Sequence, residues 1–246
     1  MPIDDHARHT RDVTPRVWLA GARASQRRLL DLIATIDDST ARRPSLLPAW
    51  TVGHLVTHLA RGAEGATRVL RGVRDRTAAV FYPHGAPGRA ADIEAGSSRP
   101  AAELLADVTA AFGRLEEAMA ELGPRDWRVG LGSGPFGLVT MPELIMHRWR
   151  EVEVHSVDLG LADVGGPTWD ELGVDYIEAE WDFTLLGLGQ RVPDGRTLVL
   201  APGDRPTRGF GHGTAVTLIE EPIGVTLRYL TGRGGSPSWP ELAPWA

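Results

Sequence analysis

The chain contains neither cysteine nor lysine among its 246 residues. Without cysteine, the protein has no disulfide, no thiolate ligand for a metal and no cysteine nucleophile. Any thiol chemistry would therefore need a thiol that arrives as a small molecule. Without lysine, Schiff-base catalysis and the usual lysine-bound form of pyridoxal phosphate are excluded. All 26 basic side chains are arginines, which suit bidentate binding of carboxylates and phosphates.

Excess positive charge and long apolar segments are also missing. The net charge is −6 and the pI is about 5.8, whereas a nucleic-acid-binding protein usually shows a basic face. No apolar run is long enough to span a membrane. The first residues, 1–6, are polar and lack the apolar core of a signal peptide. We therefore expect a soluble cytoplasmic protein whose partners are small molecules, with no nucleic acid and no membrane.

The pattern of residues changes along the chain from helical to mixed. Capping residues and apolar spacing predict helices in the first two thirds and just beyond, at 15–36, 51–74, 98–122, 140–160 and 168–184. Glycine and proline predict a loop over 81–97, and 123–138 reads as irregular. Later segments predict strands at 197–201 and 215–219, while 223–231 fits a strand or a short helix. We expect an α+β protein, with a helical bundle in residues 1–164 and a small α+β domain in residues 165–246.

Two predicted helices carry the side chains of a candidate metal site. Glu151 and His155 are four residues apart, which places them one turn apart on the same helix face. Apolar residues share that face, and a carboxylate in such surroundings needs an ionic partner or a metal. His58, on another helix, would complete a three-ligand zinc site with an open fourth position. His54 and His147 compete for a ligand role, because each lies four residues from one of these side chains.

Taken singly, the same residues also fit structural roles. A histidine such as His58 on a helix is commonly a hydrogen-bonded core or surface residue. Glu151 has Arg148 and Arg150 nearby in the sequence, so it also fits an ordinary ion pair. The pattern alone leaves both interpretations open.

Four segments resemble the mycothiol-dependent maleylpyruvate isomerase family. Residues 50–59, WTVGHLVTHL, and 149–160, WREVEVHSVDLG, resemble its two metal-ligand helices. Residues 89–97, RAADIEAGS, are similar to the family's loop before the third helix, and 227–234, LRYLTGRG, to its C-terminal Gly-Arg motif. The resemblance covers nearly the whole chain in order. It implies a DinB-like four-helix bundle followed by a domain resembling sterol carrier protein.

The resemblance also implies site residues. It assigns zinc, or another divalent metal, to His58, Glu151 and His155, and it selects His58 over His54. The three residues together, in matching order, favour the metal over separate structural roles.

Two arginines also match the family pattern. Arg233 corresponds to the C-terminal active-site arginine, and Arg89 to a second arginine that holds substrate. Each has an alternative interpretation: Arg233 as a cation near a helix C-terminus, and Arg89 as a surface arginine in a loop.

The implied activity is the cis–trans isomerisation of maleylpyruvate to fumarylpyruvate, with mycothiol as the thiol cosubstrate. Zinc would favour the thiolate, which adds to the double bond, allows rotation and is expelled. The substrate is a dianion, which suits paired arginines.

A mycothiol S-transferase acting on another electrophile is an alternative that the sequence does not separate from the isomerase. A binding or regulatory protein without turnover is a second alternative. Arg233 and a three-ligand site speak against it, because structural zinc normally has four protein ligands.

Overall fold

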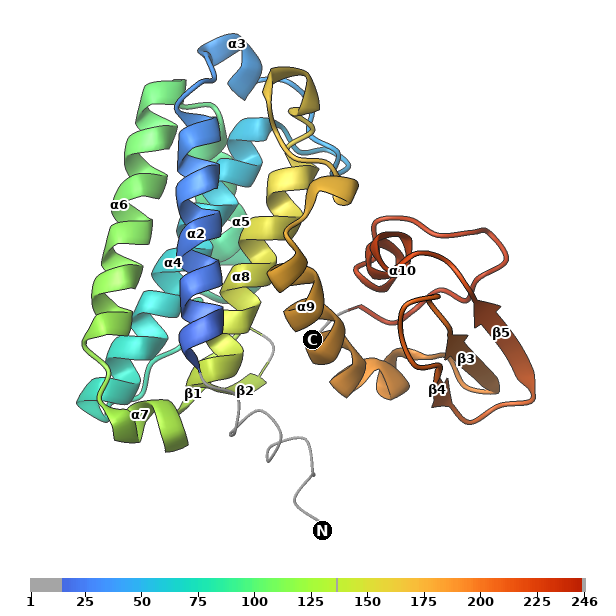
Figure 1. Ribbon diagram of the computed structural model, residues 1–246. Coiled ribbons are helices and arrows are strands. Elements are labelled where there is room, and N and C mark those ends of the chain that lie inside the picture. Colours follow the sequence, from blue (N-terminus) through green and yellow to red (C-terminus); the bar gives the residue numbers. More distant parts are fainter. Residues whose placement is uncertain (1–14, 136, 245–246) are drawn as a thin grey trace. The chain divides into compact units, whose positions relative to one another are not determined.

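The chain divides into two compact units, Met1–Pro167 (unit 1) and Thr168–Ala246 (unit 2). The computed structural model describes residues 15–135 and 137–244 (Figure 1). Helices predominate, and strands form two small sheets, so the predicted α+β class is confirmed. The residues on which the signal-peptide prediction rests lie outside the described ranges. Among the residues described, no helix combines the length and the apolar character needed to cross a membrane.

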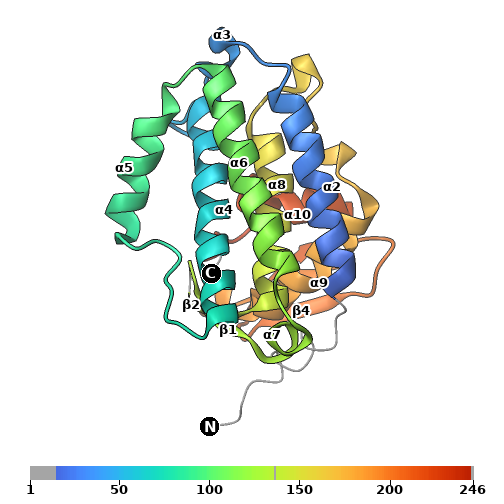
Figure 2. The ribbon, with the colours of Figure 1, turned by 90° about the vertical axis from the view of Figure 1, so that its left-hand side faces the viewer.

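Unit 1 is built around four long helices that run side by side (Figures 1 and 2). They are α2 (Pro15–Ile33), α4 (Val52–Asp75), α6 (Ala101–Ala120) and α8 (Met141–Asp158). Helix α4 packs against α6 and α8, and α2 packs against α8 and α6. Apolar residues recur on the inward faces and form the core, which includes the fully buried side chains of Leu29, Leu55, Leu59, Leu104, Leu115, Leu144 and Ile145.

Helix α8 begins and ends where the sequence predicts. The hydroxyl of Thr140 accepts a hydrogen bond from the backbone N–H of Glu143 at 3.3 Å, and the Glu143 carboxylate accepts one from the Thr140 N–H at 2.7 Å. This reciprocal pair satisfies backbone donors that a helix start leaves without partners. Gly160 follows the helix with a φ of +68°, a conformation that glycine adopts without steric cost. The cap at Thr140 and the glycine at position 160 thus set the two ends of the helix that carries Glu151 and His155.

The loop predicted over 81–97 is wrong for most of its length. It contains helix α5 (Gly85–Ser97), which packs against α4 (Figure 2). Pro87 suggested a loop, but proline is tolerated in the first turn of a helix, where no intrahelical N–H bond is lost. Gly53 of α4 lets the two helices approach closely, because a Cβ there would lie 2.1 Å from the carbonyl oxygen of Ser97. Arg89 is therefore held on a helix.

Shorter elements connect the long helices. Helix α3 (Asp38–Ala41) precedes α4, and the region predicted as irregular holds helix α7 (Pro124–Val129) and a hairpin. The hairpin pairs β1 (Leu131–Gly134) with β2 (Gly137–Thr140) in antiparallel register. Strand β2 leads directly into the cap of α8, so the hairpin is anchored at the start of the helix that carries Glu151.

Unit 2 packs two helices on a three-stranded sheet. A 3₁₀ turn at Ala162–Val164 still belongs to unit 1. In unit 2, a 3₁₀ turn at Trp169–Glu171 is followed by α9 (Val174–Arg191), β3 (Arg196–Leu200), β4 (Arg208–Gly211), β5 (Ala215–Ile219) and α10 (Ile223–Leu230). The strand order is β4-β3-β5, with β3 antiparallel to β4 and parallel to β5. The core includes Trp181, Leu188, Leu198, Leu200, Ile219, Leu227 and Leu230. The segment with two interpretations, 223–231, is thus helical, and strand β4 was not predicted.

Candidate metal centre

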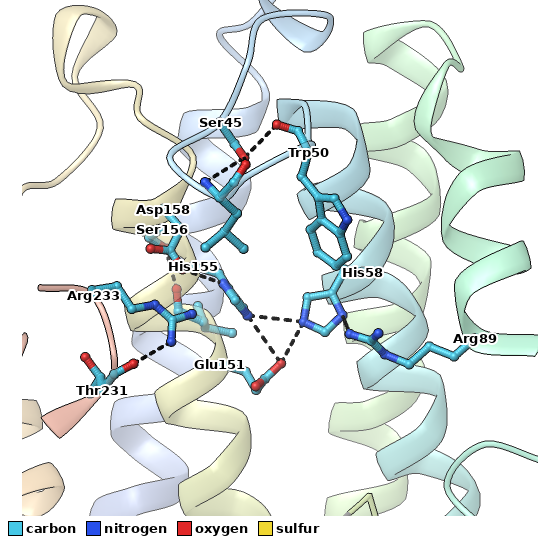
Figure 3. Close-up of polar contacts among 12 residues, drawn as sticks. Ser45, Trp50, His58, Arg89, Glu151, His155, Ser156, Asp158, Thr231 and Arg233 are labelled. Atoms are coloured by element: carbon cyan, nitrogen blue, oxygen red, sulfur yellow. Dashed lines mark hydrogen bonds and ion pairs between the residues drawn. The ribbon is translucent and has the colours of Figure 1, made fainter. Parts of the chain in front are cut away.

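Three predicted ligands meet between α4 and α8. Figure 3 shows the side chains of His58, Glu151 and His155 pointing toward one another from these helices. The Nε2 atom of His58 lies 2.9 Å from Oε2 of Glu151 and 3.2 Å from Nε2 of His155. The Nε2 atom of His155 lies 3.8 Å from the same carboxylate oxygen. The structure therefore brings together three groups that are far apart in the sequence.

The three donor atoms fit a small divalent metal ion. A tetrahedral zinc ion with bonds of about 2.0–2.1 Å separates its nitrogen and oxygen ligands by roughly 3.3 Å. The three distances of 2.9, 3.2 and 3.8 Å bracket that value. Two imidazole nitrogens and one carboxylate oxygen are also a donor set that zinc takes at sites with an open position. The residues present thus fit the implied ion.

Asp158 orients His155 from the same face of α8. Its carboxylate oxygen accepts a hydrogen bond from Nδ1 of His155 at 2.8 Å. This contact places the ring proton on Nδ1 and leaves the lone pair of Nε2 facing the cluster. The Asp158 side chain is only 1% exposed, so the contact is shielded from water. The sequence alone did not single out Asp158, although Asp158 lies three residues after His155 and so on the same helix face.

The electrostatics of the cluster keep His58 neutral and Glu151 ionised. Burial lowers the pKa of His58 to about 4, against the opposing effect of the Glu151 carboxylate. Burial alone would raise the pKa of Glu151, but the hydrogen bond from His58 and nearby positive charge hold it well below its usual value. At neutral pH the site therefore presents a neutral imidazole beside an ionised carboxylate.

Arg89 reaches the cluster from α5. One of its guanidinium nitrogens lies 3.0 Å from Nδ1 of His58, and another donates to the hydroxyl of Tyr82 at 3.3 Å (Figure 3 shows the contact with His58). A guanidinium only donates, so Nδ1 of His58 accepts, and the ring proton lies on Nε2, toward Glu151. A metal at Nε2 requires the proton on Nδ1 instead. The contact of Arg89 with His58 and metal ligation by His58 are therefore alternatives.

The two competing histidines lie outside the cluster. His54 accepts at Nδ1 from the Thr51 backbone at 3.2 Å and contacts Glu94 through Nε2 at 3.2 Å. It thereby completes the capping box of α4, which is a structural role. His147 lines the adjoining pocket but is not among the three residues whose donor atoms converge.

A pocket of about 560 Å³ adjoins the cluster. All three candidate ligands line it, together with residues of α5 and of the β1–β2 hairpin. The cation of Arg89 stacks near the rings of Trp50 and Tyr82, at 5.9 and 5.6 Å. The wall also contains a second arginine, Arg148, for which the sequence suggested only an ion pair with Glu151. A small anionic molecule therefore finds arginines next to the candidate metal ligands.

Arg233 belongs to unit 2. It follows α10, and its guanidinium donates to the carbonyl oxygen of Thr231 at 2.7 Å. The preceding Gly232 has a φ of +74°, which explains the glycine in the Gly-Arg motif. The predicted part of Arg233 in catalysis stays a prediction.

The comparisons with known proteins agree on one fold. Two solved structures match with TM-scores of 0.82 and 0.81, at 22% and 21% identity. Each alignment covers 96% of this chain and 99% of the other. They are described as the mycothiol-dependent maleylpyruvate isomerase and a histidine-to-alanine mutant of it. No curated protein matches the sequence.

The family comparison rests on the sequence of unit 1. The model of the mycothiol maleylpyruvate isomerase N-terminal domain matches residues 22–160. This range is more than half of the chain, and it contains α4, α5 and α8, which carry the convergent ligands, Arg89 and Arg148. The candidate metal centre thus lies wholly within the matched segment, and we conclude that the chain belongs to the mycothiol maleylpyruvate isomerase N-terminal domain family.

Proposed function

We propose that this protein catalyses the cis–trans isomerisation of maleylpyruvate to fumarylpyruvate, with mycothiol as cosubstrate. The observation that carries the proposal is the convergence of His58, Glu151 and His155 beside an arginine-lined pocket. The absence of cysteine supports it, because the reaction then draws its thiol from outside the protein. Membership of the family supports it, as does the activity of the maleylpyruvate isomerase whose solved structure has the same fold.

His58, Glu151 and His155 would hold the metal ion, and zinc suits this donor set. When bound, the ion favours the thiolate form of a thiol at its open position. Asp158 keeps the His155 lone pair directed at the site. Ligation by His58 would release Arg89 from Nδ1, and its guanidinium would then be available to a substrate carboxylate in the pocket.

The reaction itself needs few groups on the protein. The thiolate sulfur forms a bond to one carbon of the cis double bond, and the electron pair moves onto the conjugated carbonyl as an enolate. The former double bond is now single and rotates. The enolate pair then returns, the carbon–sulfur bond breaks, and the trans isomer leaves with the thiol regenerated. Arg89, and Arg233 of unit 2, would bind the carboxylates and stabilise the enolate charge.

A direct assay tests this proposal. Zinc-loaded protein is mixed with maleylpyruvate, with and without mycothiol, and the formation of fumarylpyruvate and the free thiol concentration are followed together. We expect turnover only with mycothiol, at constant thiol concentration. Full isomerisation in thiol-free buffer contradicts the mechanism. Consumption of the thiol into a stable conjugate identifies a transferase instead.

A further inference from the structure

Arg148 is a buried cation in the pocket wall that has few partners among the described residues. Its relative exposure is 2%. One guanidinium nitrogen donates to the backbone carbonyl oxygen of Leu59 at a long 3.3 Å, and the Nε–H is buried without a hydrogen-bond acceptor. Among the residues that the structure describes, no carboxylate lies within ion-pair distance of Arg148. Buried arginines are normally paired, because an unpaired charge in the interior is costly.

The fold makes specific room for this guanidinium. Gly62 lies in the middle of α4, where glycine costs about 1 kcal/mol relative to alanine. A Cβ at Gly62 would lie 2.6 Å from Nη1 of Arg148. Gly62 also lines the pocket. The glycine therefore allows the guanidinium to lie against α4 at the pocket wall.

The charges around the pocket are unbalanced. Its lining contains two guanidinium groups, Arg89 and Arg148, and a single carboxylate, Glu151. That carboxylate is already engaged by His58, and a metal ion would engage it further. Burial lowers the pKa of Arg148, while the charge of Glu151 opposes that shift. An incoming anion would supply the missing counter-charge.

We propose that Arg148 forms a carboxylate-binding subsite of the pocket and holds one carboxylate of the dianionic substrate. The inference rests on the proposed function for the identity of that substrate. Arg148 lies three residues before Glu151 and seven before His155 on α8, or about 4.5 and about 10 Å along the helix axis. A carboxylate held there would lie a few bonds from a carbon that reacts at the cluster. The ligand class is thus a short dicarboxylate with an alkene next to the anion.

Calorimetric titration of the zinc-loaded protein with maleate tests the subsite without any turnover. Acrylate serves as the matched probe, because it keeps the alkene and has only one carboxylate. In Arg148→Met, a side chain of similar length replaces the guanidinium. Loss of a charge-assisted hydrogen bond should weaken maleate binding by roughly 10- to 100-fold and reduce the preference for maleate over acrylate. Arg148→Lys, which keeps the charge without the planar fork, should bind maleate with intermediate affinity.

Arg114→Met is the control variant. Arg114 lies on α6 and makes an ion pair at 3.0 Å with Glu64 of α4, and neither residue lines the pocket. Loss of the Arg114 guanidinium should therefore leave the affinity for maleate unchanged. If Arg148→Met folds, retains zinc and binds maleate as the wild type does, the subsite is refuted and Arg148 is a packing residue. If Arg148→Met does not fold, Gly62→Ala decides, because its methyl group displaces the guanidinium. Wild-type affinity in that variant refutes the subsite as well.

The two proposals can fail separately. A wild-type protein without mycothiol-dependent turnover, whose maleate affinity nevertheless depends on Arg148, retains the subsite and loses the isomerase. A protein that isomerises maleylpyruvate, but whose Arg148→Met variant has unchanged maleate affinity and KM, retains the isomerase and loses the subsite.

Discussion

His155 is oriented for metal binding by a neighbour on its own helix. Asp158 accepts the Nδ1–H bond at 2.8 Å, and its side chain is almost wholly buried. The ring is therefore held in one tautomer before any ligand arrives. A hydrogen-bond acceptor that orients a ligand histidine in this way commonly raises metal affinity by about 10- to 100-fold.

We therefore predict that Asp158→Asn weakens zinc binding by about 10- to 100-fold. The amide still accepts a hydrogen bond but no longer carries the charge that polarises the imidazole. Competition with a chromophoric chelator measures the dissociation constant. Asp163→Asn is the control, since Asp163 pairs with Arg43 at the surface. Equal zinc affinity in both variants would show that Asp158 has no part in holding the metal.

His147 makes the stability of the metal-free protein depend on pH. Burial, together with the charge of Arg150, lowers the pKa of His147 from 6.5 to about 4. Between these values the unfolded chain binds a proton that the folded chain does not, so folding stability is lost as the pH falls. His147→Gln removes this contribution. Relative to that variant, the wild type should lose on the order of 2 kcal/mol between about pH 7 and about pH 4.5, measured by urea unfolding. Parallel stability profiles contradict the prediction.

The sequence predicts the ligands better than their surroundings. The one-turn spacing of Glu151 and His155 indicates a pair of ligands on one helix face, and the resemblance to the family selects His58 as the third. Arg148 and Asp158 were not recognised as site residues, because a single polar residue on a helix has the same pattern whether it faces solvent, an ion pair or a pocket. Only the packing of α4 against α8 shows that Gly62 leaves room for Arg148.

Among the secondary-structure elements, α8 is the one that fixes the candidate site. Its beginning is marked by the reciprocal hydrogen bonds between Thr140 and Glu143, which the sequence predicts because capping is local chemistry. Helix α5 was not predicted, because its glycines and Pro87 are residue types that favour loops. Its packing against α4 outweighs this local preference for a loop. Local signals thus fix α8, whereas tertiary contacts fix the helix that carries Arg89.

Removing the cap of α8 should be measurable. Thr140→Ala loses the acceptor for the Glu143 N–H, and we expect the free energy of unfolding to fall by about 1 kcal/mol. Thr140→Ser keeps the hydroxyl and should retain most of the stability. Chemical denaturation of both variants checks the prediction. Equal unfolding free energies for Ala and Ser would mean that the cap contributes nothing.

At the scale of the whole molecule, unit 2 contributes Arg233, which follows α10. The predicted assignment of unit 1 to a DinB-like bundle and of unit 2 to a fold resembling sterol carrier protein stays a proposal. The structure of unit 2 does explain the Gly-Arg motif, since Gly232 adopts a positive φ at the end of α10. The function of Arg233 rests on its match to the family motif.

We predict that Arg233→Ala lowers turnover by about a hundredfold or more without loss of metal. Arg233→Lys should also be impaired, because lysine keeps the charge but loses the planar fork. Steady-state kinetics and metal analysis on the same samples separate the two effects. Wild-type turnover in Arg233→Ala with metal bound would contradict a catalytic role for Arg233 and leave unit 2 as a scaffold.

The three-residue metal centre is tested most directly by calorimetric titration of zinc into metal-free protein. We expect one ion per chain, with binding greatly weakened in Glu151→Gln, which keeps the side-chain shape and removes the charge. His54→Gln should bind zinc as the wild type does, because His54 lies one turn away on α4 and caps that helix. Wild-type zinc affinity in Glu151→Gln, or loss of binding in His54→Gln, would contradict the assignment of His58, Glu151 and His155 as the ligands.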